Sequence, residues 1–435
     1  MYGNHDRSFT DEDAGKVGQY MVELNKLNLK VIPQWSLRDI TKLFQRIHYQ
    51  DAKKDSFINI KLHHNLLFYT LSPVSTEYID EVFDPAFKKI VDIFELDEET
   101  SEQLKNCYKA EPQIQGKFLK KGNSKIFFGS FENIDPKLTS LLNGMFQILL
   151  SNPTEPILLM GPSGFKTYLA QLFLNDAKII TLNQESVLSQ LLGASAFLSK
   201  EEAKLFYIDV ICKICHIYNR EFISKIKEGM IKKEQNDEIN ISELKEELNN
   251  EVEKHSKNLP GSFKRVIEHL KMKLFDEDVN KSDNRILSNL ELEFRPGLFL
   301  AAILEGKSLI LKNLSNLPTI ILERFNELFS GKHNLTLNED IHNTFTDKSN
   351  KELIDISSNF RVLATCPPNS VTKLSEAVLS RFSVIWIDSY KPNEQEIVLK
   401  SYIKTNKLNF DESSISILTK FAEDMNHYFH KYFSF

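Results

Sequence analysis

A short stretch of glycines, a lysine and a threonine is the part of this sequence best suited to chemistry. It consists of Gly161, Pro162, Ser163, Gly164, Phe165, Lys166 and Thr167. Glycines let backbone N–H groups close around phosphate oxygens, a lysine neutralises their charge, and a threonine hydroxyl can hold Mg²⁺. The stretch leads into an apolar helix, whose N-terminus adds partial positive charge. This pattern indicates a phosphate-binding loop for a nucleotide.

The spacing of the loop departs from the usual pattern, Gly-x4-Gly-Lys-Ser/Thr. Only four residues separate Gly161 from Lys166, and the residue before the lysine is Phe165 rather than glycine. Either the loop is one residue short, with Gly164 as its inner glycine, or it carries a bulky side chain where the backbone must turn tightly. Two interpretations stay open: a loop that binds nucleotide, and a vestigial loop that only keeps its fold.

A second departure lies at the end of the apolar run 308–313. In nucleotide hydrolases with such a loop, the corresponding strand ends in acids that orient Mg²⁺ and the attacking water. Here the run ends in Lys312 and Asn313. A lysine does not activate water, so the sequence favours nucleotide binding with weak or no hydrolysis.

Five apolar runs of similar length supply the elements that must position the loop. They cover residues 156–161, 178–183, 308–313, 360–366 and 383–388. Strands that are apolar throughout, rather than alternating, are buried on both faces, which is typical of a parallel sheet covered by helices. The predicted fold class is therefore α/β, a P-loop core with a five-stranded parallel sheet.

Periodicity and composition divide the chain into four predicted parts. They are a helical bundle at 1–85, a linker at 86–130, the α/β core at 131–390 and a partial helical lid at 391–435. In the bundle, Ser36 is expected to cap a helix whose apolar positions run from Leu37 to Ile47. In the core, a charged helical insertion covers 195–292, and its apolar positions predict an amphipathic hairpin. These positions are Ile241, Leu244, Leu248 and Val252.

Composition sets wider limits on function. The 435 residues are 41% hydrophobic, which suits a folded chain, and the net charge of −6 implies no general affinity for nucleic acid. No apolar run reaches the roughly 18 residues of a membrane helix, and the N-terminus lacks a signal-peptide core. Four cysteines are too few for a disulfide framework, so we expect an intracellular protein. Cys212 and Cys215, followed by His216, match a haem-attachment pattern, but they lie in an apolar helical run and are predicted to be buried thiols.

Taken in order, several segments resemble the dynein-related AAA+ modules of the midasin type. The most specific are the Phe…Gly-Leu…Gly-Lys run within 294–307 and the Leu-Ser…Arg-Phe run within 374–382. The other similar segments are residues 181–186, 191–193, 321–326, 335–339 and 360–365. The resemblance covers about 150–390, and Ser36 to Asp39 also resemble the sensor-2 helix of a module's lid. Lys312 and Asn313 replace the Walker B acids of that family, and Pro367 stands where its sensor-1 Asn is expected, with Asn369 two residues on.

The resemblance implies an ATP-binding module whose cofactors are ATP and Mg²⁺. Lys166 would bind the β- and γ-phosphates, and Thr167 would hold Mg²⁺ through the nucleotide. Arg381 would be the finger presented to the γ-phosphate of a neighbouring module, and Arg38 would contact nucleotide from the lid of an upstream module. The chain would then be a piece or a shortened relative of a larger machine.

The same resemblance implies partners and a cellular setting. The partners would be neighbouring AAA+ modules in a ring and pre-ribosomal protein cargo, and the setting would be nuclear assembly of the large ribosomal subunit. The sequence shows no membrane segment and no direct nucleic-acid signature. The alternative is a nucleotide-free AAA+-shaped scaffold that docks partners through the charged insertion, an alternative that Phe165 and Lys312 motivate.

Overall fold

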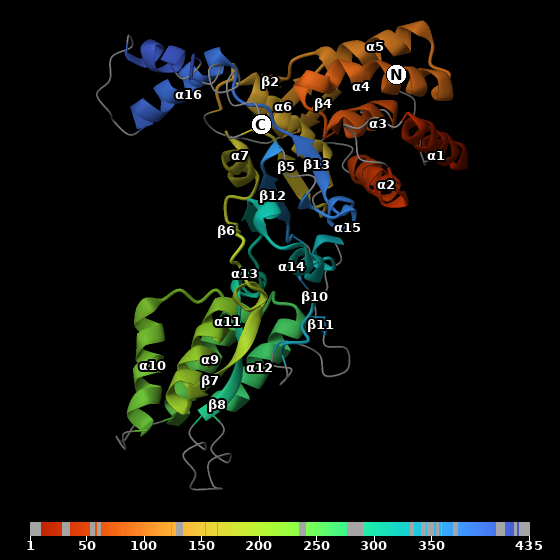
Figure 1. Ribbon diagram of the computed structural model, residues 1–435. Helices are drawn as coiled ribbons and strands as arrows, with labels where there is room; N and C mark the ends of the chain where they lie inside the picture. The colour runs from red at the N-terminus through yellow and green to blue at the C-terminus, as the bar shows by residue number, and fades with distance from the viewer. Residues whose placement is uncertain are drawn as a thin grey trace. The chain divides into compact units, whose positions relative to one another are not determined.

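Contacts divide the chain of the computed structural model into two compact units (Figure 1). Unit 1 comprises Met1–Asn175 with Leu363–Phe435, and unit 2 comprises Asp176–Val362. The structure describes residues 10–27, 35–52, 57–58, 62–122, 124–127, 134–152, 154–162, 164–234, 241–275, 290–330, 335–340, 345, 352–353, 356–357, 359–368, 373–405, 414–421 and 424–425.

A five-stranded sheet carries the core, with strand order β13-β5-β12-β9-β6. The strands are β5 (Ile157–Met160), β6 (Lys178–Thr181), β9 (Leu309–Lys312), β12 (Val362–Cys366) and β13 (Ser383–Trp386). The β5–β12, β5–β13 and β6–β9 pairs are parallel. Strands β5 and β12 are buried at every position, as strands covered on both faces must be. Each of the five predicted apolar runs supplies one strand, and the predicted fold class is confirmed.

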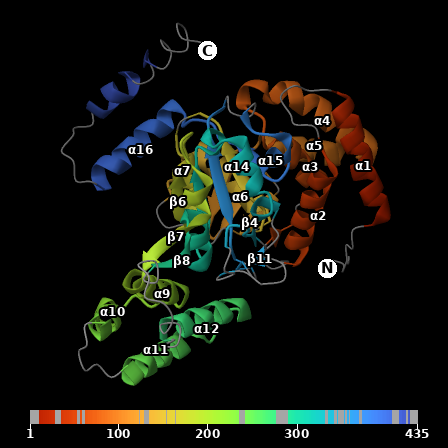
Figure 2. The same ribbon diagram turned by 60° about the horizontal axis from the view of Figure 1, so that its bottom comes forward.

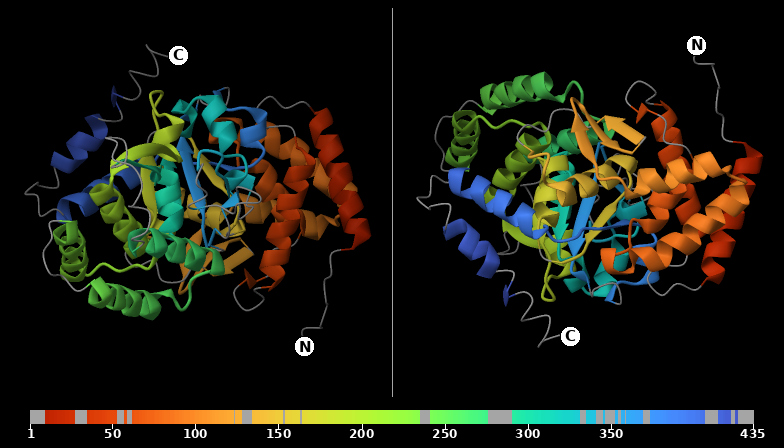
Figure 3. Two further views of the ribbon diagram at one scale, coloured as in Figure 1. Left: turned by 90° about the horizontal axis from the view of Figure 1, so that it is seen from below. Right: turned by 90° about the horizontal axis from the view of Figure 1, so that it is seen from above.

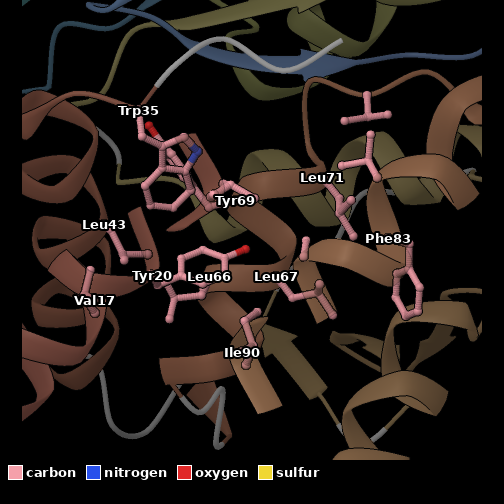
Figure 4. Close-up of a cluster of buried hydrophobic side chains, with 14 of the residues drawn as sticks. Val17, Tyr20, Trp35, Leu43, Leu66, Leu67, Tyr69, Leu71, Phe83 and Ile90 are labelled. Atoms are coloured by element: carbon pink, nitrogen blue, oxygen red, sulfur yellow. The ribbon is translucent and has the colours of Figure 1, made fainter. Parts of the chain in front are cut away.

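Five helices of unit 1 form a bundle at the N-terminal end, and Figures 1 and 2 show them gathered together. They are α1 (Asp11–Lys26), α2 (Leu37–Ala52), α3 (Leu62–Leu71), α4 (Ile79–Phe94) and α5 (Glu98–Lys109). Their apolar faces meet in one core, in which Tyr20 and Tyr69 each pack edge-to-face on Trp35 (Figure 4). The red-to-orange helices stay one group in both views of Figure 3.

The bundle extends beyond residue 85, where the sequence places its end. Helix α4 runs from Ile79 to Phe94 with Pro85 inside it, and the bundle core includes Ile90 and Leu104. A proline in a helix interior removes one backbone hydrogen bond, so local sequence argues against this helix and tertiary packing supports it. Ser36 does precede α2, but Leu37 is 78% exposed rather than part of the apolar face.

A small antiparallel sheet of order β1-β4-β3-β2 follows the bundle. Its strands are β1 (Phe57–Ile58), β2 (Gln113–Gln115), β3 (Phe118–Lys121) and β4 (Ser124–Phe127). The last residue of β3, Lys121, is only 8% exposed; its ammonium donates to Asn143 Oδ1 at 3.0 Å and lies 5.3 Å from the ring centre of Tyr108. Burial lowers the pKa of Lys121 to about 8. Lys121 is therefore a buried cation with a single neutral acceptor, and its charge costs stability.

Replacing Lys121 with methionine is expected to raise the free energy of unfolding at pH 7 by about 1–2 kcal/mol, after the loss of the bond to Asn143. Because the folded-state pKa lies below the ordinary lysine value of 10.5, the penalty is fully present below pH about 8 and fades as the pH rises toward 10.5. The difference between variant and wild type should therefore shrink between pH 7 and 9.5 in urea titrations. Lys120→Met on the same strand is the control; a less stable Lys121→Met protein, or a pH-independent gain, would contradict this account.

The helices that flank β5 and β13 in unit 1 are α6 (Thr139–Leu150), α7 (Lys166–Phe173), α15 (Glu376–Leu379) and α16 (Pro392–Thr405). Helix α6 has no capping side chain of its own, but Glu394 of α16 accepts hydrogen bonds from the Ser140 N–H and the Thr139 hydroxyl, both at 2.9 Å. This fully buried carboxylate supplies the missing cap and ties the start of α16 to α6.

Unit 2 contains the insertion, which is larger than the predicted hairpin. Strands β7 (Gly193–Ser199) and β8 (Leu290–Pro296) pair antiparallel and bracket four helices. The helices are α9 (Lys200–Ile214), α10 (Arg220–Glu234), α11 (Ile241–Ser256) and α12 (Gly261–Phe275). Of the predicted apolar face, Leu244, Leu248 and Val252 are buried, and the side chain of Ile241 lies outside the described residues. The predicted apolar positions of α11 are confirmed for Leu244, Leu248 and Val252, whereas the predicted hairpin underestimated the number of helices among the described residues of the insertion.

The remaining elements of unit 2 are short. They are α8 (Leu188–Leu191), α13 (Leu298–Leu304), α14 (Thr319–Arg324), β10 (Leu335–Thr336) and β11 (Glu352–Leu353). Cys212 and Cys215 are buried on α9, and burial raises the pKa of their thiols to about 12 and 11. The prediction of buried thiols is confirmed. Within the described part of the chain, no helix has the length and apolar character that crossing a bilayer requires.

Candidate phosphate-binding site

The phosphate loop, residues 161–167, leaves the sheet at the carboxyl end of β5. Its first residue, Gly161, has φ +142°, and a Cβ atom there would overlap the carbonyl oxygen of Ile387. The same segment is tied down by the Ile387 N–H, which donates to the Met160 carbonyl at 2.7 Å. Gly161 is therefore the position at which the loop cannot accept a side chain. Ser163 lies outside the described residues.

Phe165 is a packing residue rather than a residue in a strained turn. Its backbone has φ −90° and ψ 9°, the conformation of the third residue of a type I turn, which most residue types adopt without a glycine. Its side chain is 3% exposed and stacks on Tyr390, with ring centres 4.3 Å apart. Gly164 is exposed, and a Cβ there would meet open space. The glycine that the usual pattern places before the lysine is thus not needed by this backbone.

Replacing Phe165 with leucine is expected to lower the free energy of unfolding by about 1–2 kcal/mol, because an aromatic contact and some packing are lost while burial is kept. Nucleotide affinity should change little, since the side chain points into the core and the loop backbone is unstrained. Urea unfolding and a fluorescent ATP analogue would measure the two effects. A large loss of affinity with unchanged stability would show that Phe165 shapes the bound nucleotide instead.

Helix α7 presents an uncapped N-terminus to the loop. No side chain caps it, and its first hydrogen bond closes from the Leu169 N–H to the Phe165 carbonyl at 2.7 Å. The first N–H groups of a helix lack partners inside the helix, and together with the helix dipole they favour an anion. Gly144 of α6 allows this helix to pack closely, since a Cβ there would lie 2.8 Å from Leu169.

Lys166 is the first residue of α7 and folds back over the loop. Its ammonium donates to the carbonyl oxygen of Gly161 at 2.6 Å and to that of Pro162. Partial burial lowers the pKa of Lys166, while the nearby Cys366 acts in the opposite direction. The pKa of the Cys366 thiol is itself raised by burial to about 12, so it stays protonated and is no nucleophile. The structure thus brings a positive charge and free N–H groups to one loop, which is what phosphate oxygens require.

The residues fit a nucleotide phosphate better than they fit a complete Mg²⁺ site. Thr167, in the first turn of α7, could give its hydroxyl to a metal held by the nucleotide. In unit 2, strand β9 ends in Lys312, followed by Asn313 with φ +60°, so no carboxylate stands at that strand end. Across the described residues, no group of three His, Cys, Asp or Glu could hold a metal ion by itself.

A second charged site lies at the start of β13. Arg38 of α2 is exposed, and its Nη1 donates to Ser380 Oγ at 2.8 Å. Ser380 Oγ donates in turn to the Ala377 carbonyl at 3.2 Å, and the same carbonyl accepts from Nη1 of Arg381. The turn after α15 therefore brings together two arginines that are 343 residues apart in sequence. We call Arg38 and Arg381 the arginine pair.

The arginine pair and the phosphate loop lie at opposite ends of neighbouring strands. In the parallel β5–β13 pair, Ser383 is in register with Ile157 and Trp386 with Met160. The loop follows Met160, whereas Arg381 precedes Ser383. The four paired residues span about 13 Å, so neither arginine belongs to the anion site of its own chain's loop. Sequence reasoning named both arginines but could not place them together.

Sequence reasoning missed two further cations, Lys42 and Arg46 of α2. Both are buried, at 6% and 3% exposure, and both contact the same end of the sheet as Arg38, where β5 and β13 begin. The signal was present: Arg38, Lys42 and Arg46 are spaced four apart, which puts them on one face of a helix. Asn369, the predicted substitute for a sensor-1 Asn, lies outside the described residues.

Comparisons with known proteins add little to this geometry. No family model matches the sequence, and no curated protein matches it. Among solved structures, the chain is similar to one described as a closed-state reconstruction of Hsp104 with ATPγS and FITC casein, with a TM-score of 0.30 and 12% identity. The match covers 90% of this chain and 59% of the length of that one. A likeness so weak carries no argument, and what the structure itself shows is an α/β fold with a five-stranded sheet.

Proposed function

We propose that this chain is a nucleotide-binding module of the AAA+ type, with weak or no hydrolysis of its own. The observation that carries the proposal is the phosphate loop: Lys166 stands at the uncapped N-terminus of α7, directly after a buried parallel strand and an obligatory glycine. Weak hydrolysis is inferred from Lys312 and Asn313, which occupy the strand end where acids are expected.

The arginine pair supports a role in assemblies of such modules. Two guanidinium groups beside one turn, Arg381 on the turn and Arg38 on α2, lie at the end of β13 away from the chain's own loop and suit the phosphates of a nucleotide held by another module. Within the described part of the chain, Arg38 forms no ion pair with a carboxylate. Ring-like association with other AAA+ modules follows from this proposal.

The finer assignment rests on sequence resemblance alone. The segments within 294–307 and 374–382 resemble dynein-related modules of the midasin type. We propose on that ground a remodelling machine of large ribosomal subunit assembly, with protein cargo and a nuclear setting.

Thermal unfolding with and without MgATP tests the binding proposal. A ligand at 100 times its Kd adds about 2.7 kcal/mol to the free energy of unfolding, so MgATP should raise the Tm of wild type and leave the Tm of Lys166→Ala unchanged. Arg381→Ala should keep the full shift, because Arg381 belongs to a different anion site. A wild-type Tm that does not respond to MgATP would contradict the proposal.

The second candidate is an AAA+-shaped scaffold that uses no nucleotide. Lys312 favours it, because this side chain stands at a strand end where nucleotide hydrolases carry acids. The variant Lys312→Asp separates the two functions, with Phe165 kept because its side chain fills the core. If the native chain neither binds nor hydrolyses ATP and the repaired chain does both, the scaffold is the correct description.

A further inference from the structure

The basic face of α2 lies along the edge of the sheet in an ordered row. Arg46 contacts Glu155 and lies nearest the start of β5, Lys42 contacts Phe382, and Arg38 contacts Ser380. Successive members of the row are four residues apart, so they follow one line down the helix. The partners of Arg38 and Lys42, Ser380 and Phe382, lie in one turn, and Glu155, the partner of Arg46, accepts from Ser383 of the same segment. The row therefore fixes both the position and the rotation of α2 against the turn that carries Arg381.

The first contact of this row is a buried ion pair between Arg46 and Glu155. Arg46 Nε lies 2.9 Å from Glu155 Oε2, and Arg46 Nη2 lies 3.0 Å from Glu155 Oε1, with both side chains buried. Glu155 also accepts hydrogen bonds from the Ser383 hydroxyl and, at 3.2 Å, from the Asn152 N–H. Burial, the largest single influence, would raise the pKa of Glu155, but the charge and hydrogen bonds of Arg46, the charge of Lys42 and the Ser383 hydroxyl together outweigh it, so the pKa is lowered and the carboxylate stays ionised.

The second contact of this row is made by Lys42, whose ammonium donates to the Phe382 carbonyl at 2.8 Å. Burial lowers the pKa of Lys42, and Asp39 at 3.6 Å opposes that shift. Asp39 is itself held by the Tyr69 hydroxyl at 2.7 Å and by the Ser36 N–H at 2.8 Å. Lys42 is thus a restrained donor one turn from Arg38.

A separate contact from α3 strengthens the docking of the bundle on β13. The Ser72 hydroxyl donates to the Val384 carbonyl at 2.8 Å, and the Trp386 N–H donates to the Ser72 carbonyl at 2.6 Å. These bonds satisfy backbone groups on β13 that no neighbouring strand pairs, since β13 is the edge of the sheet.

The third contact of the row is made by Arg38, which is exposed, whereas the other two members, Lys42 and Arg46, are buried.

We propose that Lys42 and Arg46 are positioning residues that hold Arg38 against the Ser380–Arg381 turn. They act through Arg38 and touch no ligand, and the role of Arg38 in binding phosphate rests on the function proposed above. Without these two contacts, α2 can rotate on the sheet edge and Arg38 no longer joins Arg381 in one anion site.

Cross-linking tests the positioning without any nucleotide. The double variant Arg38→Cys with Ser380→Cys is treated with a short bis-maleimide in the full chain, whose four native cysteines are buried. Adding Lys42→Met should lower the cross-linking yield at least about threefold at temperatures well below Tm, whereas Lys42→Arg, which keeps a donor for the Phe382 carbonyl, should restore it. Lys16→Met, on an exposed pair of α1, is the control.

Two outcomes would overturn the proposal. One is an unchanged yield in a Lys42→Met protein that is merely less stable, since a purely structural role predicts that result. The other is an unchanged yield in Arg46→Lys, a milder change that keeps the charge, loses the paired geometry of the two hydrogen bonds to Glu155 and serves if Lys42→Met does not fold.

Binding of inorganic tripolyphosphate then tests the arginine pair. The measurement uses a Lys166→Ala background, which removes the chain's own loop lysine. Arg38→Ala should weaken binding at the pair at least about tenfold and leave the weaker binding of Arg381 measurable; Lys42→Met should weaken binding about threefold to tenfold, with no further loss in the Arg38→Ala protein. If Arg38→Ala has no effect, the phosphate role of the pair is wrong while the cross-linking result still decides the positioning. If Lys42→Met weakens binding equally with and without Arg38, the positioning is wrong.

Discussion

Replacing Glu155 with alanine is expected to lower the free energy of unfolding by about 3–5 kcal/mol, because Arg46 is left as a buried charge without a partner. Arg46 and Glu155 are 3% and 5% exposed, and two hydrogen bonds join them. The same change removes the acceptor of the Ser383 hydroxyl. The effect should therefore be among the largest of any single polar substitution in this chain.

Urea unfolding followed by tryptophan fluorescence measures this loss in both parts that the ion pair joins. The chain has two tryptophans, Trp35 in the bundle core and Trp386 on β13. Glu12→Ala, which breaks an exposed pair with Lys16, is the control and should cost less than about 1 kcal/mol. Replacing Arg46 and Glu155 together with methionine should cost less than Glu155→Ala alone, because no unpaired charge remains. Equal losses in Glu155→Ala and in the control would refute the network.

Replacing Gly161 with alanine should cost about 4 kcal/mol or more and remove nucleotide binding. Its φ of +142° is strained for any residue with a Cβ, and that atom would overlap the Ile387 carbonyl oxygen. The oxygen belongs to backbone held by the bond from the Ile387 N–H to Met160, so it cannot move away without loss of that bond. The loop and the strand end would both be displaced.

Gly164→Ala is the matched control, in the same loop and with the same added methyl group. A Cβ at Gly164 meets nothing within 4 Å, so the change should be neutral or stabilise by up to about 1 kcal/mol through the unfolded state. Denaturation and binding of a fluorescent ATP analogue would compare the two variants. Similar losses at both positions would mean that the described loop conformation is wrong.

Much of the core could be predicted from the sequence because each of its strands is a recognisable apolar run. Strands such as β5 and β12 are continuous apolar runs that end at glycine or proline, and their burial on both faces requires that composition. Helix α4 was not predicted because a proline such as Pro85 normally ends a helix. The packing of Ile90 in the bundle core stabilises the helix in spite of this proline. The insertion was predicted to be helical, but only a helical hairpin was expected. The apolar positions that pack in its core alternate in the sequence with many charged residues, so the separate helices were not distinguished.

The sequence identified individual residues of the candidate site but not the contacts between them. Lys166, Thr167, Arg38 and Arg381 were named from motif and resemblance, and their roles in binding stay predictions. The sequence left two alternatives for the loop, one residue too few with Gly164 as its inner glycine or a bulky side chain in a tight turn. The structure places the Phe165 side chain in the core beside Tyr390, a contact that neither alternative specified. The contacts from α2 to Glu155 and Phe382 span 109 and 340 residues, a separation at which no sequence period gives a signal.

Isothermal titration of the full chain with ATP and Mg²⁺, beside the Lys166→Ala variant, tests most directly whether the loop binds nucleotide. We predict a tight, saturable site in the wild type that is absent from the variant, in which only the weaker phosphate binding of the arginine pair remains, because Lys166 supplies the only side-chain cation of residues 161–167. If neither protein gives heat while both unfold cooperatively, the phosphate loop keeps only its fold and the chain is a scaffold.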